Sequence, residues 1–144
     1  GVRTSQRERP AESVVFSALE WLSPRAPEYI RASIMCGVGP NNFIHSFSDP
    51  TYGELNKKRA QYLLYQYRRY RSQQMFVGDP AEGKLCLKTL IRMQLLSRGV
   101  EGRYIQFSDE IDTHDDMWHD HARDIKTMPE REIGRNGVFV YRQD

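Results

Sequence analysis

The chain has 144 residues, of which 39% are hydrophobic and 28% are charged, a balance typical of one soluble globular domain with its own core. No apolar run approaches the roughly 20 residues that a membrane-spanning helix needs, so we expect no membrane partner. The formal net charge is only +2, from 21 basic and 19 acidic residues, and the position of the charges along the chain is therefore more informative than their sum.

The first part of the chain predicts an arm and two helices. Residues 1–9 are polar and basic and are interpreted as a flexible arm, and residues 10–144 as a single helical domain. Pro10 in a first turn and an apolar stripe at helical spacing predict a helix over 10–22. Pro27 then begins a second predicted helix, which Gly37 stops.

Two longer helices are predicted next. Thr51 with Glu54 three residues later forms a capping box, and the helical pattern extends over 51–75. Asp79 as N-cap and Pro80 in the first turn open a fourth helix over 80–98, which Gly99 terminates.

The last third of the chain changes character. The stretch GRYIQF, residues 102–107, predicts a short strand, and Ser108 caps a fifth helix over 109–126. Asn136-Gly137 is a hairpin turn signature, which predicts a C-terminal hairpin over 131–142. The expected fold class is thus mainly α, with about five helices packed in one compact domain and a small C-terminal β-hairpin or short antiparallel strands.

The two cysteines, Cys36 and Cys86, each fall inside a predicted helix and have no metal-ligand spacing. We interpret them as reduced, largely buried thiols. This cysteine usage indicates an intracellular protein, either cytoplasmic or nuclear.

The helix predicted over 51–75 has one strongly basic face. Residues 52–75 hold six basic side chains and one acidic side chain, a local charge of +5. On a helical wheel most of the tyrosines share an apolar stripe with Leu55 and Leu63, whereas Tyr65 lies among the cations on the opposite side. Cations neutralise phosphates and an exposed ring stacks on an unpaired base, so the candidate nucleic-acid-binding residues are Lys57, Lys58, Tyr65, Arg68, Arg69 and Arg71.

The helix predicted over 109–126 is the acidic counterpart. Residues 108–124 contain seven acidic side chains and a single arginine, a formal charge of −6, together with three of the four histidines. We interpret this acidic face as a candidate surface that binds a basic protein segment. Its residues are Asp112, Asp115, Asp116, His119 and Asp120. The two charged helices have three possible uses: they pair within the fold, they join one copy to the next, or each binds its own partner.

The His119-Asp120 dipeptide resembles the metal-binding pair of HD-type phosphohydrolases. That resemblance implies His45 and Asp124 as further ligands, although four residues separate Asp120 from Asp124 where the family uses a separate helix. Asp115 and His119 lie one helical turn apart and could share an ion, but two ligands do not complete a transition-metal site. We therefore assign no metal ligand, no catalytic residue and no cofactor.

The sequence favours a protein that binds rather than catalyses. The leading hypothesis is a nucleoprotein-like domain that binds nucleic acid, RNA in preference, and associates with itself. The alternative is a protein-interaction or regulatory domain without nucleic acid, and the third hypothesis is a metal-dependent HD-like phosphohydrolase.

Overall fold

The computed structural model describes residues 14–22, 29–34, 39, 41–71 and 73–107. Within these ranges it contains three α-helices, three short 3-10 helices labelled η and one two-stranded parallel sheet. The prediction of about five helices with antiparallel strands is therefore wrong. The arm over 1–9, the acidic helix over 109–126 and the hairpin over 131–142 lie outside the described residues.

Helix α1, Val14–Leu22, falls within the first predicted helix. It buries Phe16 and Leu19, because these residues lie three positions apart on one face. Trp21 points the other way and is 80% exposed.

The second predicted helix is wrong, because strand β1, Ala32–Ile34, lies where it was expected. Ile30, Ala32 and Ile34 face inward to different degrees while the residues between them are exposed, which is the two-residue period of a strand. The short strand predicted over 102–107 forms only in its second half, as β2, Ile105–Phe107, because the first half is a 3-10 helix, η5, Gly102–Tyr104. The two strands pair in parallel, with Ala32 opposite Ile105.

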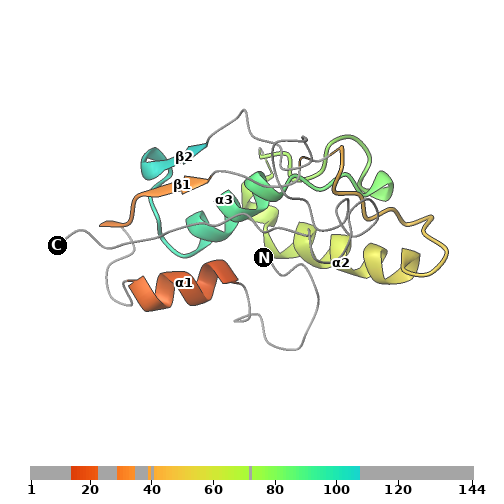
Figure 1. The fold of residues 1–144 in the computed structure, drawn as a ribbon, viewed down its shortest axis with the longest axis horizontal. Coiled ribbons are helices and arrows are strands. Elements are labelled where there is room, and N and C mark those ends of the chain that lie inside the picture. Colours follow the sequence, from red (N-terminus) through yellow and green to blue (C-terminus); the bar gives the residue numbers. More distant parts are fainter. Residues whose placement is uncertain (1–13, 23–28, 35–38, 40, 72, 108–144) are drawn as a thin grey trace, which may run out of the picture.

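One core cluster joins α1, the sheet and α3, Leu87–Ser97. In Figure 1, α3 lies between the two strands and α1, and contacts join it to both. The buried members of this cluster are Leu19, Ile34, Leu95, Val100 and Ile105. Gly99, with a φ of 88°, ends α3 as predicted.

A second core cluster forms beneath α2, Gly53–Gln66. Its buried members are Leu63, Tyr67, Met75, Leu85, Leu90 and Met93. The prediction of a helix running to residue 75 is wrong, because α2 ends at Gln66 and is followed by η3, Arg68–Tyr70. Beyond η3 the chain turns back to pair Phe76 with Leu85 in an antiparallel bridge, and this return brings Met75 into the core.

The start of α2 also differs from the prediction. Tyr52 occupies the N-cap position and makes no side-chain capping bond, so the Thr51 capping box is wrong. Instead Asp49 Oδ1 accepts hydrogen bonds from the backbone N–H groups of Thr51 and Tyr52, at 2.8 and 2.7 Å. An acidic side chain at this end also stabilises the helix, because the N-terminal end of the helix dipole is positive.

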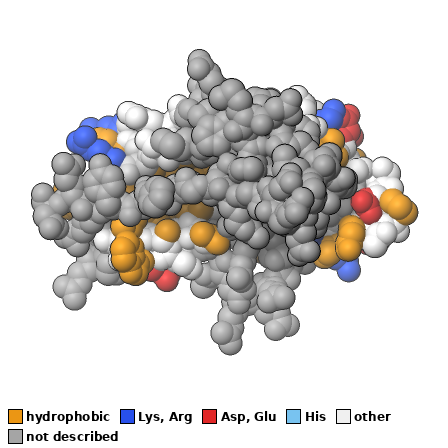
Figure 2. Space-filling view, viewed as in Figure 1, with side chains coloured by type: hydrophobic (Ala, Val, Ile, Leu, Met, Phe, Trp, Pro, Cys, Tyr) orange, Lys and Arg blue, Asp and Glu red, His pale blue; other side chains and the backbone are white. Residues whose placement is uncertain are grey.

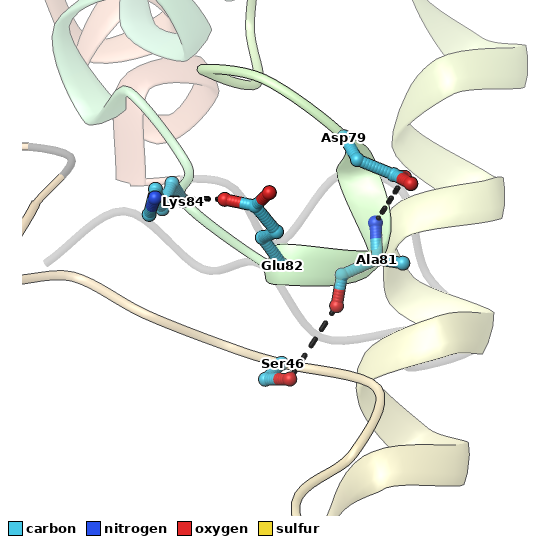
Figure 3. A network of polar contacts seen from close by, with 5 residues as sticks. All are labelled: Ser46, Asp79, Ala81, Glu82 and Lys84. Atoms are coloured by element: carbon cyan, nitrogen blue, oxygen red, sulfur yellow. Dashed lines mark hydrogen bonds and ion pairs between the residues drawn. The ribbon is translucent and has the colours of Figure 1, made fainter.

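Residues 79–86 do not continue into α3 as one helix. Asp79 Oδ1 accepts a hydrogen bond from Ala81 N at 2.9 Å, but it caps only a single turn, η4, Pro80–Glu82. Gly83 then adopts a φ of 74° and ends the turn. Figure 3 shows how this turn is held: Ser46 Oγ donates to Ala81 O at 3.4 Å, and Lys84 pairs with Glu82 at 2.7 Å.

Candidate nucleic-acid interface

Helix α2 and the turn after it present a basic surface on the side away from the core. Ala60, Leu63 and Tyr67 are buried on one side, which fixes the orientation of the helix. The opposite side carries the cations that the sequence singled out. We define the basic surface as the exposed residues Lys57, Lys58, Tyr65, Arg68, Arg69 and Arg71.

Tyr65 and Arg68 form a pair at the centre of this surface. The guanidinium carbon of Arg68 lies 4.4 Å from the centroid of the Tyr65 ring, and Nη1 donates to the Tyr65 carbonyl oxygen at 3.0 Å. Tyr65 remains 66% exposed. A cation over an exposed ring contributes about 0.5–1 kcal/mol. The pair therefore places one cation over one aromatic ring at the surface.

Arg68 and Arg69 also lie just beyond the C-terminal end of α2, where the helix dipole is negative. Cations at this position stabilise a helix whatever else they bind. Their presence at the helix end thus has a local structural cause as well as a potential use at an interface.

A hollow of about 170 Å³ opens beside the end of α2. Leu64 and Arg71 form part of its lining, so it borders the basic surface directly. The remaining lining comes from η3, from the chain that returns after it and from α3, and includes Tyr70, Gln73, Gln74, Met75, Phe76 and Met93. Sequence reasoning missed this hollow, because it extended α2 through the residues that form its wall.

A second set of arginines lies near the sheet and was not predicted. The guanidinium carbons of Arg31 and Arg103 lie 5.4 and 4.7 Å from the centroid of the Tyr104 ring. Arg92 lies over Phe107 at 5.3 Å, and Arg98 over Phe16 at 4.0 Å. In Figure 2 basic side chains reach the surface at the end of the molecule where β1 and β2 lie. The basic surface on α2 is therefore not the only cationic region.

His45 was the only residue of the HD-like hypothesis that the described ranges include. It lines a small, mainly apolar hollow together with Asn56 and Arg59. Burial lowers the pKa of His45 below its ordinary value of 6.5, and the Arg59 guanidinium acts in the same direction, against a contact with Asn56 and the charge of Asp49. A neighbouring cation and apolar walls do not suit a divalent metal ion. Within the described part of the chain no cluster of His, Cys, Asp or Glu side chains could hold a metal.

The acidic candidates Asp112, Asp115, Asp116, His119 and Asp120 lie outside the described residues. Whether they meet the basic surface of the same copy or of another thus stays a prediction. Cys86 is a free thiol that accepts a hydrogen bond from Thr89 Oγ1 at 3.2 Å.

Comparison with known proteins gives no further assignment. No protein-family model, no curated protein and no solved structure matches this chain. Among the helices of the described ranges, none is long and apolar enough to cross a membrane.

Proposed function

We propose that this chain binds nucleic acid, RNA in preference, through the basic surface on α2 and η3. The observation that carries the proposal is the exposure of five cations on α2 and the residues that follow it, with Arg68 over the exposed ring of Tyr65. Arginine and lysine neutralise backbone phosphates and release counterions, while a ring stacks on any base. Such a surface suits a ligand with a repeated negative charge and accessible bases.

Binding of this kind has a defined dependence on salt. For a single strand, the logarithm of the association constant falls with the logarithm of the salt concentration by about 0.7 for each phosphate neutralised. Five engaged cations therefore give a slope of about −3.5. Fluorescence anisotropy with a labelled single-stranded RNA at several salt concentrations measures this slope directly.

A triple substitution, Arg68→Gln, Arg69→Gln and Arg71→Gln, tests the location of the binding surface. We expect the affinity to fall and the slope to flatten by about 2. The matched control removes three exposed arginines near the sheet, through Arg31→Gln, Arg98→Gln and Arg103→Gln, and thus has the same net charge. Equal losses in both variants would mean that overall charge, and not the α2 surface, drives binding.

Self-association is the second part of the proposal. The acidic residues between 109 and 124 offer −6 of formal charge to the basic surface of another copy, a heterologous contact that builds rings or filaments. This contact competes with RNA for the same cations. Sedimentation velocity with and without RNA tests it: assembly that weakens at high salt and in the triple variant supports it.

A protein-interaction domain without nucleic acid is the second candidate function. Trp21 and Tyr29 are 80% and 81% exposed, and large aromatic side chains are enriched in binding hot spots. Under this alternative, no RNA binding is measured even at low salt, and Trp21→Ala abolishes binding to a protein partner. The anisotropy titration therefore separates the two candidates first.

A further inference from the structure

The hollow beside α2 has the properties of a site for one flat, polar-edged ring. Its volume of about 170 Å³ is below the roughly 300–1,000 Å³ of sites that enclose drug-sized ligands. Met75 and Phe76 supply apolar wall, and Tyr70 adds a half-buried ring. One ring system fits such a space, whereas a base pair does not.

One residue in the lining of this hollow carries an unpaired hydrogen-bond acceptor. Gln73 lines it, and the Oε1 atom of Gln73 is buried without a hydrogen-bond partner among the described residues. Buried polar atoms are almost always hydrogen-bonded, so an unpaired one calls for an explanation. Because Oε1 is buried, the Gln73 side chain has to rotate toward the hollow before an N–H donor on the edge of a ligand supplies the missing bond.

The surroundings of the hollow narrow the class of ligand further. Arg71 lies at once in its lining and in the basic surface, and Leu64 lies two helical turns after Lys57 on α2. A ligand that enters here therefore has a cation within reach of its attached phosphate. The chemistry required is a flat heterocycle with N–H donors that is joined to an anionic backbone.

We propose that the hollow binds one unstacked base of a single-stranded nucleic acid whose phosphates lie on the basic surface. The inference rests on the proposed function and adds to it a ligand class, because a base within a duplex cannot leave the stack without a cost. The base packs against Met75 and Phe76, and its N–H edge donates to Gln73 Oε1. Single strands are thus preferred over duplexes of the same charge.

Two RNA strands of the same length separate the base from the backbone. One strand carries all its bases, and the other has the same phosphates but abasic sugars. Stacking on a protein ring raises the affinity by roughly 5- to 150-fold per base. We therefore expect the intact strand to bind at least about fivefold tighter than the abasic strand. Equal affinities for the two strands overturn the inference but leave the proposed function standing, and failure of both strands to bind overturns both.

The Gln73→Leu variant tests whether the higher affinity for the intact strand comes from the hollow. This variant keeps the size and charge of the side chain and removes the acceptor. We expect the affinity for the intact strand to fall by about fivefold or more, toward that of the abasic strand, with the abasic affinity unchanged. Tyr65→Ala is the control for stacking at the exposed ring. In a double variant, the loss of affinity caused by Tyr65→Ala must add to the loss caused by Gln73→Leu. An unchanged ratio between strands in Gln73→Leu contradicts the inference.

Ultraviolet cross-linking of the unaltered protein to RNA gives a second readout that does not depend on a variant's folding. Mass spectrometry of the cross-linked peptides should place a base on residues 70–76. Cross-links found only at Tyr65, or only near Tyr104, would overturn the assignment to the hollow.

Discussion

Arg68 contacts Tyr65 in two ways: its guanidinium carbon lies 4.4 Å from the ring centroid, and its Nη1 donates to the backbone carbonyl oxygen of the same residue. The pair forms where α2 gives way to η3, three residues apart. It joins the charge and the aromatic surface that a single-stranded ligand needs. The first prediction follows from this geometry.

Tyr65→Ala should weaken binding to single-stranded RNA by roughly 5- to 150-fold, because a stacking ring is lost. Tyr65→Phe keeps the ring and should bind almost as tightly as the unaltered protein. Both should change the free energy of unfolding by less than about 1 kcal/mol, because the side chain is 66% exposed. Anisotropy titrations and urea denaturation measure the two effects, and equal affinity in the two variants would contradict a stacking role.

Gly53→Ala should destabilise the fold by about 1–3 kcal/mol, since its new methyl group would collide with the carbonyl oxygen of Phe47. Gly53 is buried in the first turn of α2, where backbone and side chains have little room to move. The midpoint of urea denaturation measures the change. Gly102→Ala is the matched control: its methyl group would lie 3.6 Å from Leu96 Cδ2, an ordinary contact, so its midpoint should hardly move.

The sequence predicts structure best where a local signal is sufficient. Gly99 ends α3, Asp79 caps the turn that Pro80 opens, and residues 105–107 form a strand, because turn chemistry and β-branched or aromatic residues act within a few positions. The exposure of Lys57 and Lys58 on α2 follows equally from helical spacing. These features require no knowledge of distant parts of the chain.

The errors arise where a distant segment decides the local structure. Ile30, Ala32 and Ile34 alternate as a strand does, but the partner that makes a strand of them lies more than 70 residues later, at Ile105–Phe107. Likewise α2 ends at Gln66, and the chain beyond it returns to pair Phe76 with Leu85, a residue outside the local helical pattern. The hollow beside α2 is formed by that return of the chain, so no local sequence pattern predicts it.

Leu90→Ala should cost about 2–5 kcal/mol of stability, because Leu90 is fully buried in the cluster that supports α2 and the hollow. Leu55→Ala is the control, since Leu55 is 39% exposed although the helical wheel placed it in the apolar stripe. Its effect should stay within about 1 kcal/mol. Urea denaturation measures both, and similar losses would mean that α2 is buried on a different side.

Stability should fall as the pH drops below 6.5 because of His45. Burial lowers the pKa of His45 in the folded protein, so the unfolded chain takes up a proton at a higher pH than the folded chain does. The contribution of neutral His45 to the free energy of unfolding is therefore complete above pH 6.5. It is lost progressively as the pH falls from 6.5 to the lower pKa that His45 has in the folded protein. A second loss should follow in stronger acid, where Asp49 loses the hydrogen bonds from Tyr52 and Thr51 that lower its pKa.

The His45→Gln variant isolates the first of these losses, because it keeps a polar side chain beside Asn56 and Arg59 but cannot titrate. We expect the drop in unfolding free energy between pH 7.5 and 5.5 to be smaller in this variant than in the unaltered protein. The three histidines between 114 and 121 are present in both proteins and cancel in the comparison. An NMR titration of the His45 ring supplies the direct check, and a folded pKa above 6.5 would reverse the sign of the expected effect.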